Sequence, residues 1–217
     1  MGLHMDKDLN DILVAAREVI ANEATGLQAL VNDFDPAFLD VVSLLATCQG
    51  KVFVSGSGTS GAIARRMAHL LSVCGTPSVP LQPMDALHGT MGAVITGDIL
   101  IAISRGGKSA ELNDLCERVR TRGAKVVALT SNPDAPLAAI ADIVVILPTD
   151  DVIDPGGVIA MGSTLVVGAW GDALATILMR VKGYTWDQML FTHPAGAVGE
   201  ETHVLEPLEP LQSEGAV

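Results

Sequence analysis

Two glycine-rich segments carry closely spaced hydroxyl side chains that could bind an anion. The first, VFVSGSGTSG, spans residues 52–61, and the second, ILIAISRGGKS, spans residues 99–109. In each segment an apolar run of strand length leads into glycines, which let the backbone approach a ligand closely. A helical pattern follows, and the free N–H groups at a helix N-terminus attract an anion. We therefore expect a phosphate cradle formed by Ser55, Ser57, Gly58, Thr59, Ser60, Ser104, Gly106, Gly107, Lys108 and Ser109.

Two alternatives to a phosphate site stay open. Either segment alone could be a tight strand-to-helix turn that binds nothing, although finding the same order twice favours a site. Gly56, Gly58 and Gly61 also match the G-x-G-x-x-G pattern of dinucleotide sites, which expects an acidic residue at the end of the next strand. The next apolar run ends at Pro83 without one and Asp85 lies just beyond, so a nucleotide site is the weaker alternative.

The composition favours a single domain with an aliphatic core. The chain has 217 residues, of which 49% are hydrophobic and only 3% aromatic, and a chain of this length can bury one substantial core. The formal net charge of −12 argues against a nucleic-acid partner, because phosphate backbones are bound through clustered Lys and Arg. A small phosphorylated ligand is compatible with this charge, since backbone amides and one or two cations can hold it.

The sequence predicts a cytoplasmic protein that does not span a membrane. Cys48, Cys74 and Cys116 are odd in number and widely spaced, which fits a reducing compartment better than a disulfide framework or a metal site. The N-terminus becomes polar and charged almost at once, unlike a secretory signal. An apolar segment at 158–181 is interrupted by glycines and by Asp172, and a charge in a spanning helix is costly. We therefore expect a buried helix there, with small residues suited to a subunit contact.

Periodicity predicts two N-terminal helices and then an alternation of strands and helices. Apolar residues at helical spacing cover 6–31, and a shorter helix follows Pro36. The alternation implies an α/β fold with a doubly wound, flavodoxin-like parallel sheet and helices on both faces. Ligands of such sheets bind outside the carboxyl ends of the strands, where the strand order reverses. The expected strands are 52–54, 79–81, 99–103, 126–129 and 143–147, and the expected helices are 62–73, 110–122 and 137–141.

One domain is expected over residues 1–199, with N-terminal helices at 6–48 and an α/β core at 51–199. A short helix at 186–190 closes this domain. Residues 200–217 are acidic, contain prolines and lack periodicity, so we expect an acidic tail there in preference to a strap on a neighbouring subunit.

Four segments of the chain resemble the sugar isomerase (SIS) domain family, and within it the arabinose-5-phosphate isomerases. Besides the two loops, these are DALHGTMG at 85–92 and GDALATILMRVKGYTWDQMLFTHPAGAVG at 171–199, which is the most specific. The resemblance implies a five-stranded parallel sheet, a homotetramer, and aldose–ketose isomerisation of a phosphorylated sugar without a metal or nucleotide cofactor. Relatives often carry a pair of CBS modules after this domain, and this chain ends where they would begin. We therefore expect the catalytic unit without that appended control.

The resemblance gives roles to three titratable residues. Isomerisation requires ring opening, removal of a proton beside the carbonyl, an enediolate, and return of a proton to the neighbouring carbon; one base and one acid suffice. Glu111 matches the family's functional glutamate and is the candidate base, while His193 and His88 match functional histidines that could open the ring and shuttle protons. The alternatives are a glutamate that only stabilises a helix N-terminus and histidines that only satisfy loop carbonyls.

The chain departs from the family pattern close to this chemistry. Thr59 stands where relatives carry a functional lysine, and Val152 stands where they carry an acidic residue, so either the adjacent Asp151 substitutes or that role is absent. Arg105 and Lys108 stand where relatives usually read Asn and Glu. Either Lys108 supplies the charge that Thr59 cannot, or it is an exposed loop lysine.

These departures leave the substrate and even catalysis open. The extra cations fit a phosphorylated sugar acid at least as well as arabinose 5-phosphate. A non-catalytic sensor that binds a sugar phosphate is the competing function, and a nucleotide-binding enzyme is a third.

Overall fold

A computed structural model describes residues 5–200, 205, 206, 208 and 211. The chain begins with a long helix, α1 (Met5–Asn32), and a shorter one, α2 (Ala37–Thr47), as the apolar spacing predicts. Asp35 ties α2 to the sheet, because its two carboxylate oxygens accept the N–H groups of Ala37 at 2.9 Å and Ile146 at 2.7 Å. Most of the predicted tail at 200–217 lies outside the described residues.

Five strands form a single sheet in the order β2-β1-β3-β4-β5. Every neighbouring pair is parallel, which confirms the predicted doubly wound sheet. The strand order reverses between β1 and β3, since the chain moves outward in opposite directions from these two strands. The strands are β1 (Val52–Gly56), β2 (Ser78–Pro80), β3 (Ile99–Ile103), β4 (Lys125–Thr130) and β5 (Ile143–Ile146).

The central strands are buried on both faces. All residues of β1 and β3 are buried. Along β3, Ile101 and Ile103 join the core on one face, while Leu100 and Ala102 join the core on the other. A strand covered on both sides needs a continuous apolar run, which is why the sequence pattern identifies it.

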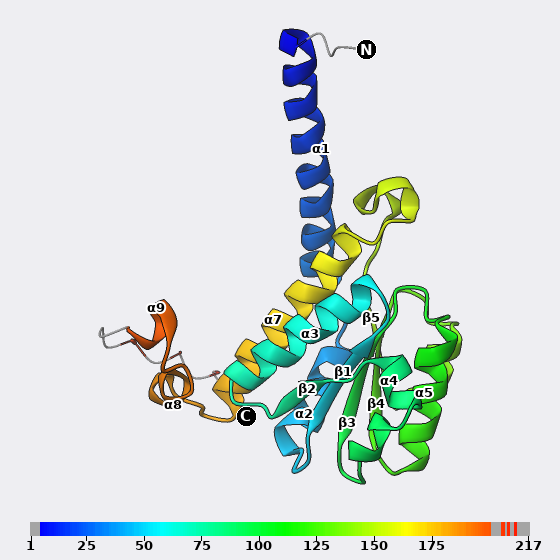
Figure 1. Ribbon diagram of the computed structural model, residues 1–217, viewed down its shortest axis with the longest axis vertical. Helices are drawn as coiled ribbons and strands as arrows, with labels where there is room; N and C mark the ends of the chain where they lie inside the picture. The colour runs from blue at the N-terminus through cyan, green and yellow to red at the C-terminus, as the bar shows by residue number, and fades with distance from the viewer. Residues whose placement is uncertain (1–4, 201–204, 207, 209–210, 212–217) are drawn as a thin grey trace, which may run out of the picture.

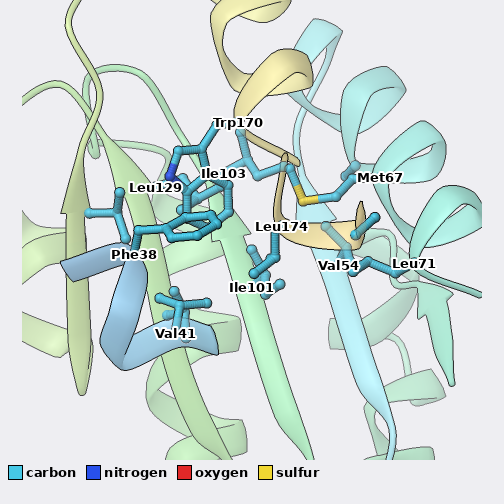
Figure 2. Packing of buried hydrophobic residues seen from close by; sticks show 14 of the residues in the cluster. Phe38, Val41, Val54, Met67, Leu71, Ile101, Ile103, Leu129, Trp170 and Leu174 are labelled. Atoms are coloured by element: carbon cyan, nitrogen blue, oxygen red, sulfur yellow. The ribbon is translucent and has the colours of Figure 1, made fainter. Parts of the chain in front are cut away.

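Helices cover both faces of the sheet (Figure 1). On one face lie α2, α3 (Thr59–Val73) and α7 (Gly162–Val181), with the end of α1; on the other lie α4 (Pro83–Leu87), α5 (Ala110–Thr121) and α6 (Pro136–Ile140). Figure 2 shows the core beneath α7, where Trp170 and Leu174 lie among strand residues such as Ile103. Trp170 meets Phe38 edge to face, with ring centroids 5.5 Å apart.

Helix α7 fits the prediction of a core helix for the long apolar segment. Among the described residues it is the one helix that is long and apolar enough, by length and composition, to cross a membrane. It packs against α1, α2 and α3, and Trp170, Leu174 and Leu178 on it are fully buried. The buried face of α7 is therefore part of the protein core.

The chain continues beyond α7 into an arm that lies apart from the sheet (Figure 1). The arm carries α8 (Trp186–Phe191) and α9 (Gly196–Gly199). A capping box starts α8, because Thr185 and Gln188 bond each other's backbone N–H groups. Short 3₁₀ turns occur at η1 (Thr90–Ala93), η2 (Asp151–Ile153) and η3 (Pro155–Gly157).

Candidate functional site

The two glycine-rich loops meet where the strand order reverses. The first loop (residues 55–60) leaves β1 and the second loop (residues 104–109) leaves β3. These strands are adjacent, and Gly56 pairs in register with Ile103, so both loops start at the same level of the sheet. This is the position at which open α/β sheets bind ligands.

A direct hydrogen bond joins the second loop's helix to the first loop. Ser57 Oγ donates to Glu111 Oε1 at 2.5 Å, and Glu111 lies in the first turn of α5. This bond, followed by the Glu111 backbone N–H, holds the pKa of the Glu111 carboxyl below its ordinary value. Glu111 is therefore ionised at neutral pH and able to accept a proton.

The first loop opens α3 through a left-handed glycine. Gly58 has φ +58° and immediately precedes α3, which begins at Thr59, three residues before the predicted start. No atom lies within 4 Å of where a Gly58 Cβ would be, so the backbone conformation, and not a lack of space, favours glycine. Thr59 is exposed and Ser60 half-buried, both in the first turn of α3.

Ser55 lies on the sheet side of the first loop. Its side chain is fully buried and its hydroxyl donates to the Leu81 carbonyl at 2.6 Å. The bond links β1 to the segment that follows β2. A phosphate contact from Ser55 stays a prediction, because it would require this hydroxyl to exchange its partner.

The second loop is held closely by neighbouring segments. Gly107 has φ +62°, and a Cβ there would lie 2.4 Å from the Ala135 Cβ. The Gly107 carbonyl accepts from the Leu137 N–H and from Asn113 Nδ2, both at 3.2 Å. Ser104 is buried, whereas Gly106 and Lys108 are exposed. Ser109 precedes α5 without a side-chain capping bond, which leaves its hydroxyl available to a ligand.

Arg105 directs its charge to two carboxylates. Its guanidinium contacts Asp151 Oδ1 at 2.8 Å, Asp154 Oδ2 at 3.1 Å and the Gly157 carbonyl at 3.0 Å. Asp151, one of the two alternatives for the family's acidic residue, is thus a partner of Arg105. Lys108 makes no ion pair with any residue that the structure describes.

Asp154 is a buried carboxylate at the start of α7. Burial alone would raise the pKa of its carboxyl, but hydrogen bonds from Ser163 and Met161 and the charge of Arg105 outweigh that effect. The pKa therefore lies below its ordinary value, and Asp154 is ionised at neutral pH. No sequence signal indicated that Asp154 would face Arg105, which lies 49 positions earlier in the chain.

The two candidate histidines lie in different places. His88 ends α4 and is exposed. His193 follows α8 on the arm, where its Nδ1 lies 2.9 Å from the Met189 carbonyl. Helix α7 separates the arm from the loop that Arg105 contacts, and a helix of 20 residues is about 30 Å long. One chain therefore brings Ser57 and Glu111 together but not His193.

A cavity of about 410 Å³ lies beside the first loop, on the side of β2. Gly56, Gly58, Arg65, Gln82 and Asp85 are among its lining residues. The sequence patterns did not predict it, because α4 is only five residues long and its start depends on the Gln82 side chain, which accepts backbone N–H groups. Asp85 shares this cavity with Gly58, so the nucleotide alternative stays a prediction.

Comparison with known proteins identifies the family. The family model described as SIS domain matches residues 45–177, more than half of the chain. The chain belongs to the SIS domain family. The matched part of this SIS domain contains the sheet, both loops and Glu111, whereas α1 and His193 lie outside it.

Curated relatives of this SIS domain include arabinose 5-phosphate isomerases. KdsD of Pseudomonas aeruginosa is 32% identical over 197 residues, which cover 91% of this chain and 60% of the relative. KdsD of Escherichia coli K12 is 33% identical over 191 residues, which cover 88% of this chain and 58% of the relative. The chain thus spans about 60% of the length of these relatives.

A solved structure shares most of this fold. The Escherichia coli CFT073 protein c3406, solved in complex with arabinose 5-phosphate, superposes with a TM-score of 0.82 at 30% identity. The match covers 85% of this chain and 98% of that protein. The predicted fold and family are therefore confirmed, while the roles of the individual site residues stay predictions.

Replacing Ser57 with alanine should raise the pKa of the Glu111 carboxyl. The hydrogen bond from Ser57 is the largest cause of the lowered pKa, and Ser57→Ala removes it. The Glu111 carboxyl carbon, followed by carbon NMR as the pH is varied, should therefore titrate at a higher pH in this variant than in the wild type. Ser72→Ala, which loses a hydroxyl bonded to the Ser78 carbonyl, is the control and should leave the titration in place. A Glu111 titration that does not move in Ser57→Ala would show that this bond does not tune the carboxylate.

Proposed function

We propose that this SIS domain is a sugar-phosphate isomerase that interconverts an aldose and a ketose through an enediolate. The observation that carries the proposal is the hydrogen bond between Ser57 and Glu111, because it brings a candidate base to the meeting point of two anion-binding loops. Its KdsD relatives are named arabinose 5-phosphate isomerases, so arabinose 5-phosphate is the first substrate to test.

The substrate phosphate lies between the two loops in this proposal. The N-termini of α3 and α5 follow the two loops, and the backbone N–H groups of Gly58 and Gly106 are the expected donors. The Gly107 N–H, also predicted to contact the phosphate, donates to the Ser104 carbonyl at 3.1 Å. Hydroxyls of Ser104 and Ser109 supply further donors, whereas Ser57 could donate to the phosphate only by giving up its hydrogen bond to Glu111. Neutral donors of this kind can hold a dianion although the whole chain carries a charge of −12.

The pairing of Arg105 with carboxylates bears on the choice of substrate. The Arg105 guanidinium pairs with two carboxylates. Lys108 is therefore the cation of the second loop that can balance the negative charge of the ligand. One such cation supports a sugar monophosphate over the more anionic sugar acid that the sequence left open. Lys108 then also stabilises the developing charge on the enediolate oxygens, in the role that Thr59 cannot fill.

Glu111 is the base in this mechanism. Its carboxylate takes the proton from C2 of the open-chain aldose, and the electron pair left behind forms the C1–C2 double bond of the enediolate as charge moves to the carbonyl oxygen. Transfer of the O2 proton to O1 and return of the abstracted proton from Glu111 to C1 then complete the ketose. A histidine that opens the ring and moves protons between oxygens completes the set, with His88 and His193 as candidates.

His193 can take part only if a second copy of the chain delivers it, because α7 separates it from Glu111. Helix α1 gives a reason for such assembly: it extends away from the α/β core in Figure 1 and exposes an apolar set of side chains. Exposed apolar surface of this kind marks an association site. We therefore include self-association in the proposal, as the homotetramer that the resemblance implies, together with the cytoplasmic location that the three unpaired cysteines favour. The exposed apolar residues of α1 are Leu9, Ile12, Leu13, Val14, Val19, Ile20, Leu27 and Val31.

Mixing two inactive variants tests whether one site draws on two copies. Glu111→Gln and His193→Ala chains, carrying different tags, would be co-expressed and the mixed assemblies purified. In a symmetric pair with shared sites, a mixed pair has one intact site of two, so purified mixed pairs should regain about half of wild-type activity and an unfractionated random mixture about a quarter. The separately purified variants combined without exchange are the control. No recovery in mixed assemblies would place His193 outside the partner's site.

Deuterium incorporation tests the reaction itself. In heavy water, wild-type protein should convert arabinose 5-phosphate to the ketose and place deuterium at C1 or C2, followed by proton NMR. Glu111→Gln should lower that rate by about 10²–10⁴-fold, because it removes the general base. Ligand binding with neither ketose nor deuterium, across a panel of pentose and tetrose phosphates and phosphorylated sugar acids, would identify a sensor instead.

A further inference from the structure

Arg105 joins the second loop to the segment that enters α7. Its guanidinium, with a side chain only 27% exposed, meets Asp151, Asp154 and the Gly157 carbonyl, all 46 or more residues away in the chain. We call this set of contacts the Arg105 clasp. The segment it grips, residues 150–161, follows β5 and leads into α7 at the carboxyl edge of the sheet.

The clasp reaches α7 through a buried carboxylate. Asp154 has a side-chain exposure of 0%, and its Oδ1 accepts the N–H groups of Met161 at 2.8 Å and Ser163 at 3.0 Å. Its Oδ2 has no hydrogen bond of good geometry within the described chain, and the guanidinium at 3.1 Å is the charge that faces it. A buried carboxylate with one such partner depends strongly on that partner.

The backbone of Arg105 is held by other contacts. The Arg105 carbonyl accepts from the Ser131 N–H, Ser131 Oγ and Thr130 Oγ1, each at 2.9 Å. Gly107 is anchored independently by Leu137 and Asn113. The shape of the second loop, and with it the N–H groups offered to a phosphate, therefore does not require the guanidinium.

The Arg105 clasp also holds the segment at 150–161 next to the first loop. Arg105, Ser60 and Ser163 line a gap of about 20 Å³ between the first turns of α3 and α7, which has room for about one water molecule. Releasing the segment at 150–161 would open this gap next to the turn that carries Thr59 and Ser60. The contacts of Arg105 therefore affect how much of this gap is open next to the first loop.

We propose that Arg105 is a positioning residue for the isomerase reaction, which holds the segment at 150–161 against the site and does not bind the substrate phosphate. This inference rests on the proposed function for its kinetic effect, and on the geometry alone for the clasp. It accounts for a cation in the phosphate loop whose charge is directed to two carboxylates. It also gives Asp151 a role that is not proton transfer.

The proposal predicts a separation between turnover and phosphate binding. Arg105→Met should lower kcat for arabinose 5-phosphate by about tenfold to a hundredfold, since loosening a wall misplaces the reacting groups. The Kd of inorganic phosphate, measured by calorimetry, should change by less than about threefold, because the loop backbone keeps its anchors. Arg105→Lys should restore part of kcat by returning the charge that Asp154 faces.

The partner variants test whether the effect passes through the clasp. Asp154→Asn should lower kcat like Arg105→Met, and the double variant should lose no more than about threefold beyond the worse single variant. Asp151→Asn, at a side chain 83% exposed, is the variant least able to disturb folding and should give a smaller loss of the same kind. Hydrogen exchange at residues 157–164 should accelerate in Arg105→Met.

Lys108→Met is the matched control, because it removes a cation from the same loop without touching the clasp. It should raise the Kd of inorganic phosphate by about tenfold or more, while hydrogen exchange at residues 157–164 stays unchanged. Arg66→Met, which breaks an exposed ion pair between α3 and α7, controls for the loss of any arginine and should change neither kcat nor phosphate binding.

The outcomes separate three accounts. If Arg105→Met weakens phosphate binding as Lys108→Met does and leaves hydrogen exchange at 157–164 unchanged, Arg105 is a phosphate ligand and the proposal is wrong. If exchange accelerates while kcat is retained, the clasp is structural only and the positioning role is wrong. If wild-type protein turns over no sugar phosphate, the proposed function fails, yet phosphate binding and exchange still decide between clasp and ligand.

Discussion

The contact on which this site depends is the hydrogen bond from Ser57 to Glu111, which spans 54 positions of the chain. It exists because β1 and β3 are parallel neighbours whose carboxyl ends lie level in the sheet. The chain leaves β1 toward one face through α3 and leaves β3 toward the other through α5. The two helices therefore diverge on either side of the opening, and a small ligand can reach both of their N-termini.

The charged residues around this opening fall into two groups, which differ in whether they form ion pairs. Glu111 and Lys108 form no ion pair within the described part of the chain, whereas Asp151 and Asp154 both pair with Arg105. Asp154 also accepts the first N–H groups of α7, so the second group fixes the long core helix to the edge of the sheet. A loop rich in cations is thus not by itself a measure of how anionic its ligand is.

The sequence predicted the sheet and the two loops because their signals are local. Residues 99–103 form an unbroken apolar run because both faces of β3 are covered. Glycine at position 58 is suited to the positive φ that the backbone adopts there, just before α3. Helix α4 left no such signal, being a single capped turn. Other features depend on which distant segments meet in three dimensions, and residue spacing along the chain does not specify those contacts. They are the partners of Arg105, the hydrogen bond of Ser55 to the Leu81 carbonyl and the separation of His193 from Glu111.

The central claim is that one phosphate is held between the two loops with the sugar directed at Glu111. A crystal structure of the Glu111→Gln variant with arabinose 5-phosphate tests it most directly. The account predicts phosphate oxygens within about 3 Å of donors from both loops, and C1 and C2 facing position 111. A phosphate bound to Arg105, or a ligand seated in the cavity beside Asp85 with the two loops empty, would contradict it.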